Sequence, residues 1–319
     1  MTATDAARIV VVGEALVDIV YRPSGVGDEA PGGSPANVAL TLGRLGRTPR
    51  LVTCLGDDDR GRRVRRWLEE SGVAVTAISA RRTATAAAHL DETGAARYAF
   101  DLQWDLGGQG ASAAGHADVV HTGSVAAVLE PGASEVAVLV RAARSRAIIT
   151  YDPNIRPALV DDPVAVRARV DELVGLADVV KASDEDLRWL HPGRNLEEVA
   201  QEWQQRGAAI VVVTLGAAGA LAVTDDGIVR VPAVPAAVVD TVGAGDTFMG
   251  TLLDGLVALG GSAAALRAPG GGIRLDDLET ILRRCALAAS ITVSRPGADP
   301  PRAAELDLRG AASGAVHTH

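Results

Sequence analysis

The sequence contains few aromatic residues, one lysine and no excess of basic charge. The shortages of aromatic and basic residues limit the kind of core and the classes of binding partner. Aromatic residues are 3% of the 319 residues, against 48% for hydrophobic residues as a whole. The core must therefore be built from Ala, Val and Leu, which suits buried parallel strands. The lysine is Lys181, and because arginine is abundant we attribute the shortage to a GC-rich genome. The formal net charge of -9 argues against binding to nucleic acid or to anionic membrane surfaces, since both need basic patches.

Cysteine is also scarce. Cys54 and Cys285 lie in apolar segments without CxxC spacing, which is typical of small buried side chains in a reducing compartment. Residues 1–8 contain no apolar stretch of signal-peptide length, and no run elsewhere is long enough to span a membrane. These features predict a cytoplasmic protein.

Several common catalytic and nucleotide-binding motifs are missing. No GxxxxGK[ST] occurs, and the turn after the first strand reads VGEA instead of GxGxxG, which argues against a P-loop and against a dinucleotide fold. There is no HExxH, and the six histidines are scattered, so we do not expect a histidine-rich metal site. A phosphate site in this chain would have to use backbone donors, a metal and a few local cations.

Apolar runs alternate with helical patterns along the whole chain. Strands are predicted at 9–12, 51–55, 118–121, 147–151, 178–181 and 210–214, and helices at 35–45, 134–144, 163–176 and 196–206. This alternation predicts a parallel sheet covered by helices on both faces.

Two segments, 15–31 and 83–104, interrupt this pattern with short alternating runs. They predict antiparallel strands outside the main sheet, forming a small flap that excludes water from a phosphoryl transfer. We expect one main domain over residues 1–308 and a flexible tail, rich in Gly, Ala and Ser, over residues 309–319.

The segment DTVGAGDTF, residues 240–248, places a glycine turn and an acid directly before a long apolar helix. Gly243 and Gly245 let backbone N–H groups converge, and the first helical turn adds unpaired donors and the positive end of the helix dipole, so a phosphate is favoured there. Asp246 could take a proton from a hydroxyl that attacks this phosphate. The alternative is that Asp246 merely caps the helix.

A second glycine pair opens the first predicted helix in GGSPAN. Gly32 and Gly33 permit close approach of a ligand to the backbone, and Asn37 can both donate to and accept from a hydroxyl. Asp18, just beyond the first strand, can accept hydrogen bonds from two adjacent hydroxyls. The alternative is an ordinary loop with proline at the first helical position and a solvated Asp in a turn.

Further polar residues follow predicted strands, where ligands gather on a parallel sheet. Arg156, in DPNIR, has a guanidinium group that can donate two parallel hydrogen bonds to a phosphate or a sugar oxygen. In KASDED an acid could order the water shell of nucleotide-bound Mg²⁺, or Ser183 and Asp186 could form a capping arrangement. Residues at the end of the 210–214 strand and just beyond it could admit a phosphate to the backbone: Thr214, Gly216 and Gly219.

Taken in order, these residues resemble the PfkB or ribokinase-like family of carbohydrate kinases, over residues 9–301. The segments GGSPANVALTLGRLG (32–46) and DTVGAGDTFMGTLLDGL (240–256) are similar to the two diagnostic signatures of the family, with YDPNIR, KASDED and VVVTLGAAGAL between them. The resemblance implies a ribokinase-like three-layer α/β/α fold with a mostly parallel central sheet and a small β lid. It also implies transfer of the γ-phosphoryl group of ATP to a sugar hydroxyl with Mg²⁺.

The resemblance further implies residue roles, in which Asp246 is the catalytic base and the backbone of Gly243, Ala244 and Gly245 forms the anion hole. Expected sugar contacts are Asp18, Gly32, Gly33, Asn37, Phe100, Arg156 and Asp246, and expected ATP contacts are Ser183, Thr214, Gly216, Gly219, Gly243 and Gly245. Asp240 matches a ligand of K⁺. The family often carries Asn-x-x-Glu where this chain has Ser183 to Asp186, so the Mg²⁺-ordering acid is either Asp186 or Glu185.

The form GGSPANVA favours fructose as the acceptor over ribose or 2-keto-3-deoxygluconate. A kinase for another sugar, a sugar acid or a nucleoside is the nearer alternative, and a nucleoside would want aromatic surface from Phe100 or Trp104. A non-catalytic sugar-binding regulator is the farther one, and it would be expected to lack Asp246 or the glycine turn. A homodimer paired through the lid is a further expectation, since exposed sheet faces tend to be covered.

Overall fold

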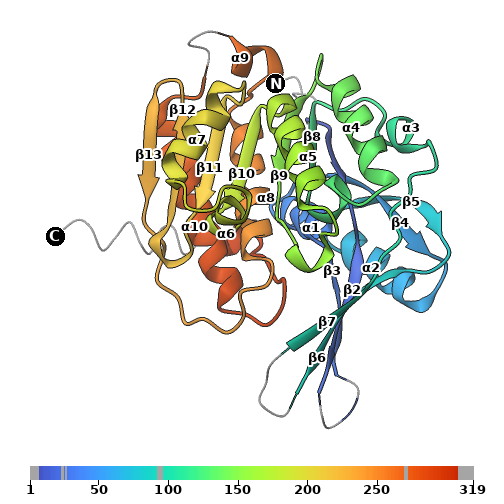
Figure 1. Ribbon diagram of the computed structural model, residues 1–319. Helices are drawn as coiled ribbons and strands as arrows, with labels where there is room; N and C mark the ends of the chain where they lie inside the picture. Colours follow the sequence, from blue (N-terminus) through green and yellow to red (C-terminus); the bar gives the residue numbers. More distant parts are fainter. Residues whose placement is uncertain (1–6, 23–24, 26, 92–95, 269–271, 308–319) are drawn as a thin grey trace.

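A nine-stranded sheet forms the centre of the computed structural model, which describes residues 7–22, 25, 27–91, 96–268 and 272–307 (Figure 1). The strand order is β13-β12-β11-β10-β9-β8-β1-β4-β5, with parallel pairing from β11 to β5 and antiparallel pairing of β12 and β13. The strands are β1 (Ile9–Val12), β4 (Arg50–Gly56), β5 (Ala74–Ala80), β8 (Val119–Gly123), β9 (Ile148–Asp152), β10 (Val179–Ser183), β11 (Ile210–Thr214), β12 (Ala220–Thr224) and β13 (Gly227–Val231). Parallel pairing brings the carboxyl ends of β1, β8, β9, β10 and β11 to one edge of the sheet.

Helices cover both faces of this sheet, because its central strands are nearly continuous apolar runs that are buried on both sides. One face carries α1 (Ser34–Arg44), α2 (Asp59–Glu69), α8 (Ala244–Ala258), α9 (Ala263–Arg267) and α10 (Leu275–Val293). The other carries α3 (Gly110–Ala114), α4 (Gly132–Ala143), α5 (Pro163–Leu176), α6 (Asp184–Leu190) and α7 (Leu196–Gln205). Short 3₁₀ turns occur at Ser124–Ala127, Pro157–Leu159 and Gly216–Ala218. The predicted three-layer α/β/α fold is confirmed.

A second, four-stranded sheet extends from this body at the lower end of Figure 1. Its order is β3 (Glu29–Gly32), β2 (Leu16–Tyr21), β6 (Ala84–Leu90) and β7 (Ala96–Asp101), so it is built from the two segments that the sequence places outside the main sheet. The predicted antiparallel pairing is confirmed for the two outer pairs, but it is wrong for the central pair, because β2 and β6 come from separate segments and pair in parallel. We call this sheet the lid.

Polar contacts join the lid to α2. Glu29 of β3 forms ion pairs with Arg60 and Arg63 of α2. Just before β6, the Thr83 hydroxyl donates to Asp58 Oδ1 at 2.7 Å, while the same Asp58 oxygen caps α2 by accepting from Gly61 N at 2.8 Å. The base of the lid is therefore tied to the start of a body helix.

Trp104 requires a correction. It is one of the two aromatic candidates near the lid for stacking on a nucleoside base, but its side chain is 3% exposed and its Nε1 donates to the Ala126 carbonyl oxygen at 3.0 Å. An apolar indole is better placed in the core, where Trp104 also contacts Gly132 at the start of α4. The tail predicted for residues 309–319 lies outside the described residues. Within the described ranges, no helix combines the length and apolar character needed to cross a membrane.

The contact between α1 and α8 depends on a glycine. A Cβ added at Gly250 of α8 would lie 2.6 Å from Thr41 Cβ and 3.1 Å from the Val38 carbonyl oxygen, both on α1. The two helix backbones can approach each other this closely because Gly250 has no side chain. The relative position of α1 and α8 therefore depends on this residue.

We expect Gly250→Ala to destabilise the fold by about 1–3 kcal/mol, the usual cost of overpacking a core. The matched control is Gly175→Ala in α5, where an added Cβ would meet nothing within 4 Å and should be neutral or stabilising by up to about 1 kcal/mol. Urea unfolding curves measure both changes. Equal stability of the two variants would show that the α1–α8 contact is not tight.

Candidate active site

The segment before α8 forms a tight turn that presents backbone donors. Gly243 caps the helix with φ 76°, in the left-handed region that favours glycine, and a Cβ there would lie 2.6 Å from Ala298 Cβ. Asp240 fixes the segment that leads into this turn. Its Oδ1 accepts from Val242 N at 3.0 Å, and its Oδ2 accepts from Gly297 N at 2.9 Å. The N-terminus of a 15-residue helix and a glycine turn thus meet at one point, which is the arrangement that binds anions.

Asp246 is the third residue of α8, and its carboxylate points toward α1. The side chain is 6% exposed. Oδ1 accepts from Ser34 Oγ at 2.6 Å and from Asn154 Nδ2 at 3.4 Å, while Oδ2 accepts from Asn37 Nδ2 at 2.8 Å. The alternative in which Asp246 merely caps the helix is wrong, because Gly243 occupies the cap position and has no side-chain cap.

Sequence reasoning missed two of these donors. Ser34 lies inside the GGSPAN motif, and Asn154 lies inside DPNIR, so both were in view without being assigned a role. Asn154 has φ 39°, an uncommon value for a residue with a side chain. That conformation directs its amide toward Asp246, and Arg156 Nη1 in turn donates to Asn154 Oδ1 at 2.6 Å.

One atom of this cluster is left without a partner. Asn37 Oδ1 is buried and accepts no hydrogen bond from the described residues. Buried polar oxygens are almost always paired in native proteins, so this one fits a donor from a ligand such as a sugar hydroxyl.

Asp18 reaches the same region from strand β2 of the lid. Gly32 faces it, and a Cβ at Gly32 would lie 2.0 Å from Asp18 Oδ2, so glycine makes room for the carboxylate. Burial raises the pKa of Asp18 to about 6; the charge of Arg156 acts against this shift and that of Asp246 adds to it. Asp18, Arg156 and Asp246 therefore share one electrostatic environment.

Gly33 and Phe100 complete the predicted sugar contacts. Gly33 caps α1 with φ 103°, and a Cβ there would lie 2.6 Å from the Glu14 carbonyl oxygen, so a side chain is excluded. Phe100 lies on β7, half-buried, with its ring stacked on Tyr98 at 6.2 Å between centroids. The structure thus gathers Asp18, Gly32, Gly33, Asn37 and Arg156 around Asp246, whereas the described contacts of Phe100 stay within the lid.

The predicted nucleotide residues lie at the ends of β10 and β11. Ser183 and Thr214 are direct register partners there. Gly216 follows with φ 55° and open space around it, whereas Gly219 is needed for packing, since a Cβ would lie 2.1 Å from the Val231 carbonyl oxygen. Ser183 and Thr214 are therefore brought together by the parallel register, and Gly216 follows Thr214 by two residues.

The two candidate Mg²⁺-ordering acids differ in what they contact. Ser183 and Asp186 form a capping box, and Asp186 Oδ1 also accepts from Ile155 N at 2.7 Å, so both oxygens of this buried carboxylate already have donors. Glu185 is exposed. Mg²⁺ usually binds nucleotide phosphates, water and one or two carboxylates, which the exposed Glu185 fits better than the fully bonded Asp186.

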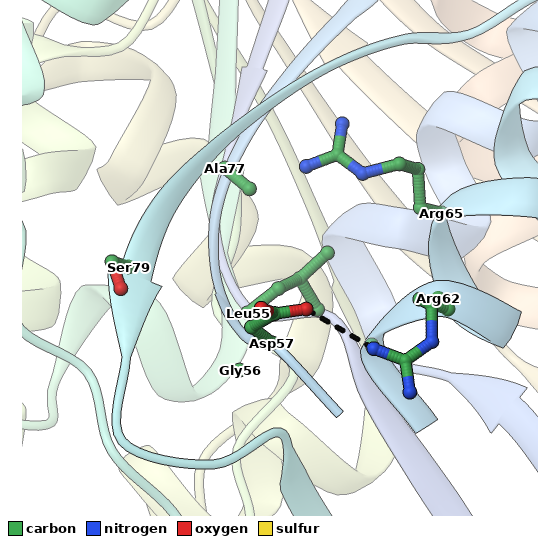
Figure 2. A pocket seen from close by; sticks show the side chains of 8 residues that line it. Leu55, Gly56, Asp57, Arg62, Arg65, Ala77 and Ser79 are labelled. Carbon is green, nitrogen blue, oxygen red and sulfur yellow. Dashed lines mark hydrogen bonds and ion pairs between the residues drawn. The ribbon is translucent and has the colours of Figure 1, made fainter. Parts of the chain in front are cut away.

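A pocket of about 250 Å³ lies elsewhere, between α2 and strands β4 and β5 (Figure 2). It is lined by Leu55, Gly56, Asp57, Gly61, Arg62, Arg65, Ala77 and Ser79. Arg62 is already paired with Asp57 and Asp59. None of the predicted site residues lines this pocket, so we do not assign the chemistry to it.

Known proteins resemble this chain over most of its length. The model of the pfkB family of carbohydrate kinases matches residues 6–304. A fructokinase from Rhizobium leguminosarum bv. trifolii is 37% identical over 260 residues, which are 78% of this chain and 79% of the relative. A crystal structure of fructokinase with bound ATP from Xylella fastidiosa has a TM-score of 0.84 and 28% identity, covering 96% of this chain and 99% of that one.

A fructokinase double mutant from Vibrio cholerae O395, in a form with bound fructose, ADP and potassium ion, has a TM-score of 0.79 and 26% identity. The match covers 95% of this chain and 98% of that one. The glycine turn, the buried acid behind it and these matches lead to one conclusion: the chain belongs to the PfkB family of carbohydrate kinases and is fructokinase-like.

Proposed function

We propose that the protein transfers the γ-phosphoryl group of Mg-ATP to a hydroxyl of fructose, with Asp246 as general base and the backbone amides of Gly243, Ala244 and Gly245 as the anion hole. The observation that carries this proposal is the placement of a buried carboxylate at the third position of α8, directly after the glycine turn. A base and an anion site thus adjoin each other.

In the proposed reaction, the sugar hydroxyl gives its proton to a carboxylate oxygen of Asp246 while its oxygen bonds to the γ-phosphorus. The bond from this phosphorus to the bridging oxygen breaks, and that oxygen leaves with its electron pair on ADP. The turn amides stabilise the charge on the transferred phosphoryl group. Ser34, Asn37 and Asn154 fix the carboxylate so that little reorganisation is needed. Mg²⁺, ordered through water by Glu185 or Asp186, would neutralise charge on the phosphates.

Fructose is the favoured acceptor because the relatives with the higher identities are fructokinases and because the GGSPANVA motif favours it. The unpartnered Asn37 Oδ1 and the Asp18 carboxylate supply acceptors for its hydroxyls. A nucleoside is less favoured, since Trp104 is buried in the core and cannot stack on a base. A non-catalytic regulator is less favoured again, because Asp246 and the glycine turn are both present.

A monovalent cation belongs to the same proposal. Asp240 joins the segment before the glycine turn to residue 297, so an ion held there would stiffen the anion hole. The Vibrio cholerae relative binds potassium ion, which supports K⁺ as that ion. A cytoplasmic location and a homodimer paired through the lid stay predictions.

We expect Asp246→Asn to lower kcat for fructose phosphorylation by roughly 10² to 10⁴, the range for loss of a general base, while sugar binding and the fold persist. The matched control is Asp277→Asn, because Asp277 is the third residue of α10 as Asp246 is of α8. A coupled assay of ADP release measures kcat for both. An Asp246→Asn variant with near wild-type turnover would contradict the role of Asp246.

The raised pKa of Asp18 predicts a pH dependence of sugar binding. A carboxyl with a pKa of about 6 is protonated below pH 6 and loses acceptor capacity there, so KM for fructose should rise about tenfold as the pH falls through 6. Asp18→Asn should abolish that pH dependence. Glu14, whose pKa burial raises to about 7, is the competing cause. If the dependence survives in Asp18→Asn, the titrating group is not Asp18.

A further inference from the structure

Lys181, the one lysine of the chain, is a charged residue on a buried strand, where a lysine is unusual. It is in the middle of β10 between buried valine and alanine residues, and it is 3% exposed. Its Nζ donates to Asp152 Oδ2 at 2.7 Å and to the Gly245 carbonyl oxygen at 3.4 Å. The ammonium group therefore lies directly behind the glycine turn, on the side away from solvent.

A buried cation at this point has an energetic cost. Burial acts most strongly and would lower the pKa of Lys181, but the charge of Asp152, the hydrogen bond to it and the charges of Asp186 and Asp246 together raise the pKa above its usual value. The side chain is therefore charged at neutral pH. Burial also raises the pKa of Asp152, to about 7, against the opposing charge of Lys181. A buried ion pair generally stabilises a fold little more than apolar residues of similar size would, so stability alone is a weak reason for it.

The pair connects three parts of the active site. Asp152 ends β9, and two residues later Asn154 donates to Asp246. Lys181 bridges Asp152 to the first turn of α8, where a Cβ at Gly245 would lie 3.1 Å from Nζ. The second Asp152 oxygen is buried and has no partner among the described residues, so Lys181 is the interaction that holds this carboxylate.

We propose that Lys181 is a positioning residue for phosphoryl transfer. Its buried ammonium group holds the glycine turn against the loop that carries Asn154, and it places a fixed positive charge behind the anion site. This inference rests on the proposed function. In this role Lys181 acts through Gly245 and Asp152, the two residues that its ammonium group contacts. Because the charge is already in place before the reaction, it stabilises charge that develops on the phosphoryl group without reorganisation.

The same strand supplies a matched control at its other end. Asp178, directly before β10, is fully buried, and Arg267 of α9 donates to both of its oxygens at 2.6 Å. Arg267 also donates to the Ala147 carbonyl oxygen, at the amino end of β9. This pair joins the same two strands as Lys181 and Asp152 do, but at the edge opposite the glycine turn.

The test compares Lys181→Met with Arg267→Met in a fructose and Mg-ATP assay. Both variants should unfold at lower temperature, since each leaves a buried carboxylate unpaired. Lys181→Met should also lose about tenfold to a hundredfold in kcat with KM for fructose changed less than about threefold, whereas Arg267→Met should keep the wild-type kcat. Equal, near wild-type kcat values in both would overturn the inference. A wild-type enzyme without activity on fructose would instead contradict the proposed function.

If Lys181→Met does not fold, two measurements keep the inference testable. The double variant Lys181→Met/Asp152→Asn leaves no buried charge unpaired, and it should fold yet retain the loss in kcat; wild-type kcat would overturn the inference. In the wild-type protein, ¹⁵N-lysine labelling gives a single side-chain ammonium resonance because the chain has one lysine. That resonance should shift when a non-hydrolysable Mg-ATP analogue and fructose bind, and an unchanged resonance would contradict the proposed position behind the anion site.

Discussion

The site depends on one constraint: the carboxylate of Asp246 has to meet α1 and the loop after β9 at the same point where the glycine turn presents its amides. Ser34 and Asn37 reach it from α1, and Asn154 from the end of β9. The spacing of these donors follows from the packing of α8 on α1, which the missing side chain of Gly250 permits. A small displacement of either helix would separate the base from its donors, so the core contact and the chemistry are coupled.

The charged groups of the site are also held in place by the fold. The chain carries a net charge of -9, yet the anion site needs no cluster of exposed lysines. In the proposed site, backbone amides face the position of the phosphate, Arg156 lies beside Asn154 on the side proposed for the sugar, and the buried ammonium of Lys181 lies behind the turn. Fixed donors and charges of this kind stabilise a transition state better than mobile surface charges, because they are already oriented when the reaction begins.

Local sequence patterns predicted the features of the fold that depend on residues close together in the chain. The glycine turn before α8, the order of strands and helices and the two lid segments follow from glycine, periodicity and turn residues, and all are found in the structure. The partners of Asp246 could not be predicted, since Asn154 becomes a donor only through its uncommon backbone angle and a contact across 92 residues. No role could be predicted for Lys181, because its pairing with Asp152 depends on strand register, and the donor that Asp186 receives from Ile155 is supplied by tertiary packing alone.

The most direct test is the release of ADP from Mg-ATP with fructose, ribose, 2-keto-3-deoxygluconate and adenosine offered separately, each with and without K⁺. The site described above predicts a strong preference for fructose, because Asp18 and Asn37 offer acceptors for sugar hydroxyls and Trp104 is buried in the core, where it cannot stack on a base. K⁺ should raise the rate by stiffening the turn after Asp240. Turnover of adenosine in preference to fructose, or of none of the four acceptors, would contradict this account.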